Sequence, residues 1–424
     1  MADPLTRAEA AAGDPVFDPF DPAWSTDPFG LYADLRERAP VHRNNLGFWV
    51  VARHADCLAL LRDRRASSDG QNIDPTHLSE SLQARFPAAD DPLRVAMARV
   101  RPFLFRDPPD HTRLRGLVSK AFTPRMVESL RDLTSRVVDE LLDGLVESGR
   151  DGPVDLLESF AYPLPVRVIC ELLGVPAGDQ DRFRTWSGAL ARGLDPDFLL
   201  SPEVIEERVA ALAAFAGYFF ELLAERRRSP GDDLLSRLVQ AEEEGSVLTE
   251  GELLSTCILL LVAGHETTVN LISGGAVALM EHPDELRRFR DDPTVARTAV
   301  EEMLRYVSPV QLTGRFMTED VRLGGATLER GDLAMVLLAS GNRDPDAFAD
   351  PDRFDVGRDP NNHLGFGFGL HHCLGAPLAR METGVALAAL VRRVRTLELA
   401  SDRLIYRDTV VLRGLEALPV TLTA

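Results

Sequence analysis

Lysine is almost absent from this chain of 424 residues: Lys120 is the only one, so arginine carries nearly all of the positive charge. Acidic side chains outnumber basic ones by 66 to 47, which gives a formal net charge of -19 at pH 7. A surface of this sign repels nucleic-acid phosphates and anionic lipid headgroups. We therefore expect neither a nucleic acid nor a membrane as a partner.

Cysteine is also scarce, and its spacing excludes two common uses. The four cysteines are Cys57, Cys170, Cys257 and Cys373. They are far apart and lack the CxxC pairing of a zinc or redox site. No disulfide framework is indicated.

Long apolar runs are missing too. The first residues hold no apolar stretch of signal-peptide length, so we expect a cytoplasmic protein. The most apolar run, 253–263, is shorter than the ~20 residues needed to cross a bilayer, and Ser255 and Thr256 interrupt it. A buried core helix fits this run better.

The chain shows no internal repeats and no low-complexity linker. Apolar periodicity predicts helices at 27–40, 54–63, 295–306 and 376–394, and almost without interruption over 110–292. Strands are predicted at 47–53, 321–323, 333–338 and in the last twenty residues, and 64–106 is predicted as a long loop with one short helix. We expect one domain over 1–424, mainly α with a minor β portion, whose first 20 or so residues are disordered or loosely held.

The clearest helix start is Thr249-Glu250-Gly251-Glu252. Thr249 can cap the amide of Glu252 while Glu252 reaches back, which is a capping box. The helix is predicted to run to about Met280, roughly 45 Å at ~1.5 Å per residue. Such a helix would cross the whole protein as a central spine.

The segment 366–375, Phe-Gly-Phe-Gly-Leu-His-His-Cys-Leu-Gly, places Cys373 immediately before a predicted helix. Helix amide dipoles and free glycine amides favour a negative sulfur, so we expect a lowered thiol pKa and a metal-binding thiolate. A buried free cysteine is the plain alternative. A dinucleotide loop fails on spacing, because the glycines do not form GxGxxG, and the neighbouring histidines lie too close to Cys373 for the usual zinc set.

The segment 263–268, Ala-Gly-His-Glu-Thr-Thr, brings polar residues into the middle of the apolar spine. Burying them costs free energy unless they are bonded or functional. Ala263 and Thr267 share one helix face, and Gly264 removes side-chain bulk, so a flat ligand could approach the backbone. The alternative is a helix kink, in which Thr267 hydrogen-bonds the carbonyl of residue 263.

These two segments resemble the signatures of one family, the cytochrome P450 superfamily. Its haem-binding pattern Phe-x-x-Gly-x-His-x-Cys-x-Gly is matched by Phe366, Gly369, His371, Cys373 and Gly375. Its Ala-Gly-x-(Asp/Glu)-Thr-Thr pattern is matched by 263–268. The resemblance covers nearly the whole chain and is to soluble bacterial members, of the actinobacterial type that hydroxylates macrolides and other secondary metabolites.

The resemblance implies the cytochrome P450 fold, a triangular, helix-rich prism with a long central helix over haem b (iron protoporphyrin IX). Cys373 would be the axial iron ligand. A thiolate ligand donates electron density and favours O–O cleavage, which suits oxygen activation. Thr267 would hydrogen-bond dioxygen and water at the distal face, and Glu266 would help relay protons. Ala263 and Gly264 would lie against the haem.

Haem propionates need cationic donors. His111 and Arg115 are four apart on one predicted helix face, as two donors to the same edge should be. The resemblance adds Arg315 and His371 as the other propionate contacts. Taken without the family, each of the four is an ordinary solvated charge.

Glu302 and Arg305, three apart on a predicted helix, can form an ion pair. Alone, this pair would be a common surface salt bridge. The resemblance implies instead that Arg353 joins them in a buried charge network that fixes the cysteine loop. We expect a structural role for this network.

The resemblance predicts a monooxygenase that takes electrons from a separate ferredoxin or flavodoxin, uses O2, and hydroxylates or epoxidises a medium-sized hydrophobic substrate. We expect it to act as a monomer. An arginine-rich face over 99–125 could dock an acidic ferredoxin. The substrate pocket would be lined by 64–106, the stretch near 180–205, and residues of the spine and the segment after it: Leu259, Val262, Ala263, Val310 and Gln311.

Two rival functions remain at this point. One is a haem-thiolate enzyme of oxidative coupling, ring formation or peroxygenation. The other is a non-catalytic haem-binding protein. The acid–alcohol pair Glu266–Thr267 favours electron-driven oxygen reduction over both.

Overall fold

The computed structural model describes residues 16–21, 23–85, 101–240, 242–243 and 246–423. Most of the expected loose start, residues 1–15, lies outside this part of the chain. The expectation is wrong at its end, because Phe17 is buried and its ring lies 4.8 Å from that of Trp24 and 6.4 Å from that of Phe48. The chain is therefore anchored to the core from Phe17 onward.

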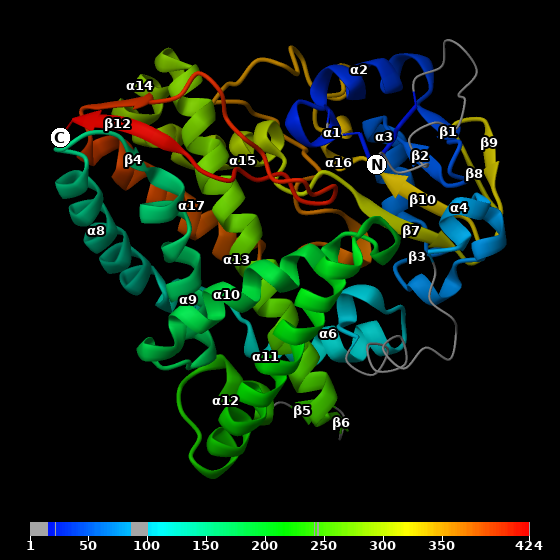
Figure 1. Ribbon diagram of the computed structural model, residues 1–424, viewed down its shortest axis with the longest axis horizontal. Coiled ribbons are helices and arrows are strands. Elements are labelled where there is room, and N and C mark those ends of the chain that lie inside the picture. Colours follow the sequence, from blue (N-terminus) through cyan, green and yellow to red (C-terminus); the bar gives the residue numbers. More distant parts are fainter. Residues whose placement is uncertain (1–15, 22, 86–100, 241, 244–245, 424) are drawn as a thin grey trace.

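Helices form the larger part of the molecule (Figure 1). The longer ones are α2 Phe29–Arg38, α3 His54–Arg62, α6 Asp110–Ala121, α8 Arg131–Ser148, α9 Pro163–Leu173, α10 Gln180–Ala191, α11 Pro202–Arg228, α13 Glu250–Glu281, α14 Pro283–Asp291, α15 Ala296–Val307 and α17 Ala376–Arg393. Shorter ones are α1 Ala23–Thr26, α4 Glu80–Gln83, α7 Pro124–Ser129, α12 Leu234–Gln240 and α16 Leu338–Gly341. A π-helical turn, η5 Leu157–Ala161, precedes α9. Single 3-10 turns are η2 Gly70–Asn72, η3 Pro75–His77, η4 Phe103–Phe105, η6 Ala177–Asp179, η7 Arg192–Leu194, η8 Asp197–Leu199, η9 Pro293–Val295 and η10 Gly369–His371.

The strands form small sheets at the edges of the helical part. The largest has the order β1-β2-β10-β7-β3, with β10 parallel to β2 and the other neighbours antiparallel. Its strands are β1 Val41–Arg43, β2 Trp49–Val51, β3 Ala66–Ser67, β7 Thr313–Met317 and β10 Leu333–Val336. A second sheet, β11-β12-β4, joins β4 Val154–Asp155, β11 Thr396–Leu399 and β12 Pro419–Thr423. Two hairpins are β5 Glu242–Glu243 with β6 Ser246–Val247, and β8 Val321–Leu323 with β9 Ala326–Leu328.

The predicted mainly α architecture with a minor β portion is confirmed, with differences at element ends. The strand predicted at 333–338 stops at Val336 because α16 begins at Leu338. Of the last twenty residues, only Pro419–Thr423 form a strand, and the segment before it holds an isolated bridge between Tyr406 and Leu415. The described part of 64–106 agrees with the predicted long loop and one short helix: it holds α4 Glu80–Gln83 as its α-helix, together with β3 and the 3-10 turns η2, η3 and η4.

Helix α13 is the spine of the fold and runs through the centre of the molecule, with α17 behind it (Figure 1). The capping box at Thr249 and Glu252 is confirmed, and the helix is 32 residues long, about 48 Å. It packs against α9, α10, α15 and α17. Its length and apolar composition would suffice for a membrane span, but 67% of the apolar window is buried among other helices. That burial marks it as the core helix of the fold.

Candidate functional site

The cysteine loop, residues 364–375, leads directly into α17. The amide of Cys373 donates to the carbonyl of Phe366 at 2.9 Å, and the amide of Gly367 donates to that of Leu364 at 2.8 Å. Gly369 has a φ of +70°, and a Cβ there would lie 2.7 Å from the carbonyl oxygen of Leu61 at the end of α3. Only glycine allows this close approach, so the sequence itself fixes the loop against α3.

The Cys373 thiol lies beside the start of α17 at Ala376, as predicted. Burial raises its pKa, while hydrogen bonds from the amides of Gly375 and Ala376 and the charges of Arg115 and Arg380 lower it. The net pKa is raised, so the prediction of a lowered thiol pKa is wrong for the free protein. Desolvation of the sulfur outweighs the amides and the two guanidinium groups. These same groups would stabilise a thiolate bound to a metal.

The four predicted propionate donors gather beside the loop. The imidazole rings of His111 on α6 and His371 on η10 lie 4.3 Å apart. Arg315 on β7 is almost fully buried, and its printed hydrogen bonds go to Thr313 and to the neighbouring carbonyl of Gly314. Arg115 donates to the carbonyl of His372 at 2.5 Å. The sequence thus brings donors from three segments to one place.

These donors pass a direct test of fit to an anionic cofactor edge. Both ring nitrogens of His111 and Nδ1 of His371 are buried without a hydrogen-bond partner among the described residues. Burial, with the charges of Arg315, His111 and Arg115, lowers the pKa of His371 to about 3. Burial also lowers the pKa of Arg315 to about 10, although the charge of Asp107 acts the other way. Unpaired buried donors are costly in a folded protein, and haem propionates match their chemistry.

On α13, Ala263 is exposed and Thr267 is half-exposed, although most residues around them are buried. The Thr267 hydroxyl donates to the Ala263 carbonyl at 2.6 Å, so the hydrogen bond of the kink alternative is present. A Cβ at Gly264 would face α9 and meet Cδ1 of Ile169 at 3.4 Å, which is an ordinary contact, so the place of Gly264 beside a flat ligand stays a prediction.

Glu266 faces a different side of α13, into a polar network. It is 1% exposed. Arg407, which lies before β12, donates to its Oε2 at 2.7 Å, and the hydroxyl of Tyr162 donates to Oε1 at 3.4 Å. The neighbouring His265 hydrogen-bonds Ser187 of α10 at 2.9 Å. Arg407 was not predicted, because 141 residues separate it from Glu266 and no local pattern links them.

The predicted substrate-lining residues divide into two groups. Leu259 and Val262 lie on α13 within one turn of the exposed Ala263, and Val310 is half-buried and bridged to Leu412. Gln311 is a correction. Its amide accepts from the Tyr32 hydroxyl at 3.1 Å and donates to the Ser308 carbonyl at 2.6 Å, so its polar group is held inside the protein.

The predicted charge network is present with one change of partner. Arg305 forms two hydrogen bonds of 2.8 Å to Glu302, and both side chains are fully buried. The second guanidinium on Glu302 belongs to Arg358, at 3.1 and 3.2 Å. Arg353 contributes only its backbone carbonyl, which accepts from Arg305 and Arg358, so its predicted side-chain role is wrong. The path of the loop decides whether Arg353 or Arg358 turns toward Glu302. The spacing of the two arginines in the sequence does not contain this information.

A second ion pair supports the cysteine loop and was missed. Arg380 of α17 donates to both oxygens of Glu301 at 2.6 and 2.9 Å, and its guanidinium lies 4.5 Å from the Phe366 ring centre. Nε2 of His363 lies 3.0 Å from the same carboxylate, while its Nδ1 accepts from the amide of Gly365. Burial alone would raise the pKa of Glu301, but the bonds from His363 and Arg380 outweigh it and lower the pKa to about 2. The two adjacent acids, Glu301 and Glu302, were the sequence feature that could have indicated this second ion pair.

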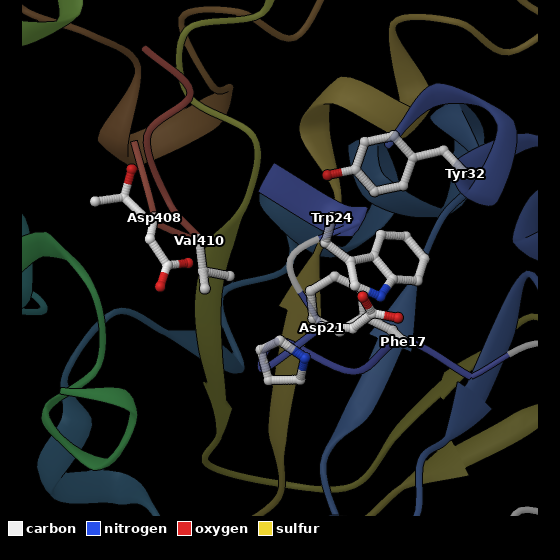
Figure 2. A pocket seen from close by; sticks show the side chains of 8 residues that line it. Phe17, Asp21, Trp24, Tyr32, Asp408 and Val410 are labelled. Carbon is white, nitrogen blue, oxygen red and sulfur yellow. The ribbon is translucent and has the colours of Figure 1, made fainter. Parts of the chain in front are cut away.

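Two hollows elsewhere on the molecule do not involve the cysteine loop. One, of about 10 Å³, lies between the N-terminal aromatic residues and residues 408–410, and Figure 2 shows Asp408 and Val410 facing Phe17 and Trp24 across it. It has room for at most one water molecule. The other, of about 320 Å³, is an open cleft between α13, α15 and residues 413–415.

Comparisons with known proteins agree with this site. The model of the family described as Cytochrome P450 matches residues 74–414. The polyketide biosynthesis cytochrome P450 PksS of Bacillus subtilis is 40% identical over 96% of this chain and 99% of its own length, and its solved structure superposes with a TM-score of 0.84, covering 96% of this chain and 100% of that one. The 6-deoxyerythronolide B hydroxylase of Saccharopolyspora erythraea is 40% identical over 94% of this chain and 97% of its own length. The vitamin D(3) 25-hydroxylase of Pseudonocardia autotrophica is 40% identical over 98% of both.

The site is that of a haem-thiolate protein. It combines a thiol on a glycine-rich loop, buried hydrogen-bond donors that fit the propionates of a haem, and a long helix with an exposed polar turn. The chain belongs to the cytochrome P450 family. It is a monooxygenase whose cofactor is protoporphyrin IX haem, as predicted.

Arg358→Gln should destabilise the protein, and Arg353→Gln should not. The first change leaves part of the Glu302 carboxylate unpaired in the interior, which costs about 2 kcal/mol or more. The second leaves the accepting carbonyl in place, and the Arg353 side chain is exposed. Urea unfolding of the two variants checks this, and equal losses of stability would contradict the assignment.

Glu301→Gln should weaken the protein by about 2 kcal/mol at neutral pH, because a charged acceptor of three hydrogen bonds is lost. The folded-state pKa of about 2 lies below the ordinary value of 4.5. The stabilisation is therefore complete above pH 4.5 and is lost as pH falls toward 2. Thermal unfolding of wild type and variant across this range measures the difference. The exposed Glu398→Gln is the control, and a gap that widens on acidification would disprove the ion pair's contribution.

Proposed function

We propose that this cytochrome P450 hydroxylates or epoxidises a medium-sized hydrophobic molecule of bacterial secondary metabolism. The observation that carries the proposal is the open face of Ala263 and Thr267 on a helix that is otherwise buried. Haem with a thiolate ligand supplies the oxygen-activating chemistry. The chain's own residues then hold the cofactor, deliver protons and choose the substrate. We further propose that the protein acts as a cytoplasmic monomer.

Four side chains would hold the propionates while Cys373 binds the iron. His111, His371 and Arg315 have buried donors that lack an acidic hydrogen-bond partner in the described chain. Arg115 lies close enough to the Cys373 sulfur for each to shift the pKa of the other. Phe366 and Gly375 belong to the loop that holds the sulfur, through the Phe366 carbonyl and the Gly375 amide.

Thr267 and Glu266 would manage protons. The Thr267 hydroxyl uses its hydrogen for Ala263 and keeps lone pairs that can accept a hydrogen bond from a water molecule on the open face. Glu266 is the nearest acid along the helix, and its carboxylate could take a proton from solvent and pass it to that water. This pair favours electron-driven oxygen reduction over peroxygenation.

The electron donor would dock beside the cysteine loop. The arginine-rich face predicted over 99–125 is largely occupied within the chain, since Arg101 pairs with Asp69, Arg106 with Asp110, and Arg113 with Glu252. Arg99 lies outside the described residues. Phe368 and Leu370 are exposed next to Cys373, and the Arg62 guanidinium lies 4.3 Å from the Phe368 ring centre. A separate acidic ferredoxin or flavodoxin fits an apolar patch with a cationic edge.

The substrate class is inferred from the lining residues and the relatives. The predicted lining residues Leu259, Val262, Ala263 and Val310 are all apolar and would form an apolar wall. Two relatives carry names that specify hydroxylation of a macrolactone, 6-deoxyerythronolide B, and of the secosteroid vitamin D3. Both are hydrophobic molecules of medium size. Either scaffold is therefore a suitable probe for this pocket.

A panel that contains 6-deoxyerythronolide B, vitamin D3 and related apolar scaffolds should include binders with micromolar Kd. An apolar molecule over the haem displaces water from the iron, so each binder should shift the Soret band toward shorter wavelength. Charged analogues of the same scaffolds should bind at least about ten-fold more weakly, because burying an unpaired charge is costly. Preferential binding of the charged analogues would refute the apolar substrate class.

Thr267→Ala should leave haem binding intact and lower the share of electrons that end in hydroxylated product by about ten-fold, because a proton-handling hydroxyl is lost. Thr268→Ala is the matched control, since its hydroxyl is buried and bonded to the Gly264 carbonyl. Product formed per NADPH, with a ferredoxin and its reductase as donor, measures both. The enzyme is a peroxygenase if Thr267→Ala makes product from hydrogen peroxide at the wild-type rate and no product is formed with NADPH, ferredoxin and reductase.

A further inference from the structure

The loop 404–415, between β11 and β12, contacts elements that are far apart in sequence. Its base is closed by the bridge between Tyr406 and Leu415 and by the amide of Arg407, which donates to the Gly414 carbonyl at 2.9 Å. The loop crosses the front of the molecule toward α1 (Figure 1). Next to its base, Arg413 donates to the Thr26 carbonyl of α1 at 2.8 Å. The loop is thus tied down at its base and along one side.

One end of the loop holds the acid of the central helix. The Arg407 guanidinium lies 2.7 Å from Oε2 of Glu266, and this carboxylate is 1% exposed. The Arg407 side chain is 32% exposed, so it spans from the buried carboxylate to solvent. A buried carboxylate that loses a cationic partner is strongly destabilised. Arg407 is therefore placed to hold the Glu266 carboxylate in position.

The tip of the loop is held by another buried acid, Asp195. Its two carboxylate oxygens accept the amides of Val410 and Val411 at 3.2 and 2.8 Å, and its side chain is almost fully buried. Asp195 directly follows η7, in the stretch near 180–205 that we expect to line the substrate pocket. The amide of Gln311 also donates to the Val411 carbonyl, which ties the tip to the segment after α15.

The same stretch reaches the helix a second time. Ser187 of α10 lies 2.9 Å from Nδ1 of His265, the residue before Glu266. The Tyr162 ring packs edge-on against His265 at 4.5 Å, and its hydroxyl reaches Glu266. In the described part of the chain, the side chains of His265 and Glu266 are thus contacted from the loop, from α10 and from Tyr162, which directly precedes α9.

We propose that loop 404–415 couples the substrate-lining stretch to proton delivery, with Asp195 as its latch and Arg407 as the positioning residue of Glu266. A substrate that shifts the segment after α10 moves Asp195, and the loop carries that movement to Arg407. Glu266 then gains a proton from solvent water, passes it to water beside Thr267, and returns to its carboxylate form. The inference rests on the proposed role of Glu266 and Thr267.

The test is a double-mutant cycle of Asp195→Asn and Arg407→Gln in the haem-loaded, full-length enzyme. Asp195→Asn replaces one acceptor oxygen by an amide group that cannot accept from Val410 or Val411. It should speed hydrogen exchange of these amides by about ten-fold and also speed exchange in 263–268, which it does not touch. This readout needs no substrate and no turnover.

The functional arm uses whichever of 6-deoxyerythronolide B and vitamin D3 gives the larger Soret shift. Each single variant should lower product per NADPH by about two- to ten-fold, and the double variant should be no worse than the poorer single one. Arg407→Lys keeps the charge and should recover part of the loss, which guards against a variant that simply fails to fold. Asp402→Asn and Arg403→Gln change exposed residues just before the loop and should leave both readouts unchanged.

Four results separate the coupling proposal from the proposed proton pathway. Multiplicative losses in the double variant would show that Asp195 and Arg407 act independently, and the coupling would be wrong. If Asp195→Asn changes only the substrate Kd, Asp195 is a residue of the substrate pocket, and its proposed role as the latch of the loop is wrong. If Thr267→Ala fails to uncouple, the proposed proton pathway itself fails. If Thr267→Ala uncouples while both loop variants do not, only the inference drawn here falls.

Discussion

A fully buried ion pair, Glu302 with Arg305, is the constraint on which the site depends. Neither side chain reaches solvent, so either one without its partner would leave an uncompensated charge in the interior. The segment after α16 satisfies the pair by wrapping around it, since the Asn342 carbonyl accepts from Arg305 at 2.9 Å. The Asn342 side chain then accepts the amide of Leu364, at the base of the cysteine loop, at 2.6 Å. The position of Cys373 thus depends on a buried ion pair outside the cysteine loop, to which Asn342 connects the loop.

The adjacent acids of α15 divide this task because successive helix residues point about 100° apart. Glu302 faces the wrapped segment, whereas Glu301 faces α17 and receives Arg380. Arg380 also lies over the Phe366 ring, so one guanidinium links α15, α17 and the loop. Two neighbouring side chains therefore hold the cysteine loop from two directions. This arrangement is rigid where the iron ligand must be fixed, although the loop itself lacks regular secondary structure over most of its length.

Sequence patterns over a few residues predicted much of the site. They failed where a contact depends on how distant parts of the chain come together. The capping box of α13 and the place of Cys373 before α17 follow from residues a few positions apart, so the sequence contains them. Arg353 was predicted in the role that Arg358 takes, because both lie on one irregular segment whose path is set by the whole fold. The thiol pKa was predicted with the wrong sign, because amide dipoles are visible in a sequence and desolvation is not.

Glu266 and Thr267, the two residues of α13 that we propose to handle protons, face different environments. Thr267 shares the open face with Ala263, while Glu266, one residue earlier, is turned about 100° toward Arg407 and Tyr162. No hydrogen bond joins their side chains among the described residues, so a proton has to pass between them by way of water or a side-chain movement. The presence of both residue types in the motif is therefore insufficient for their cooperation. Because Arg407 holds Glu266 on a different side of the helix, cooperation of Glu266 with Thr267 would require this ion pair to shift.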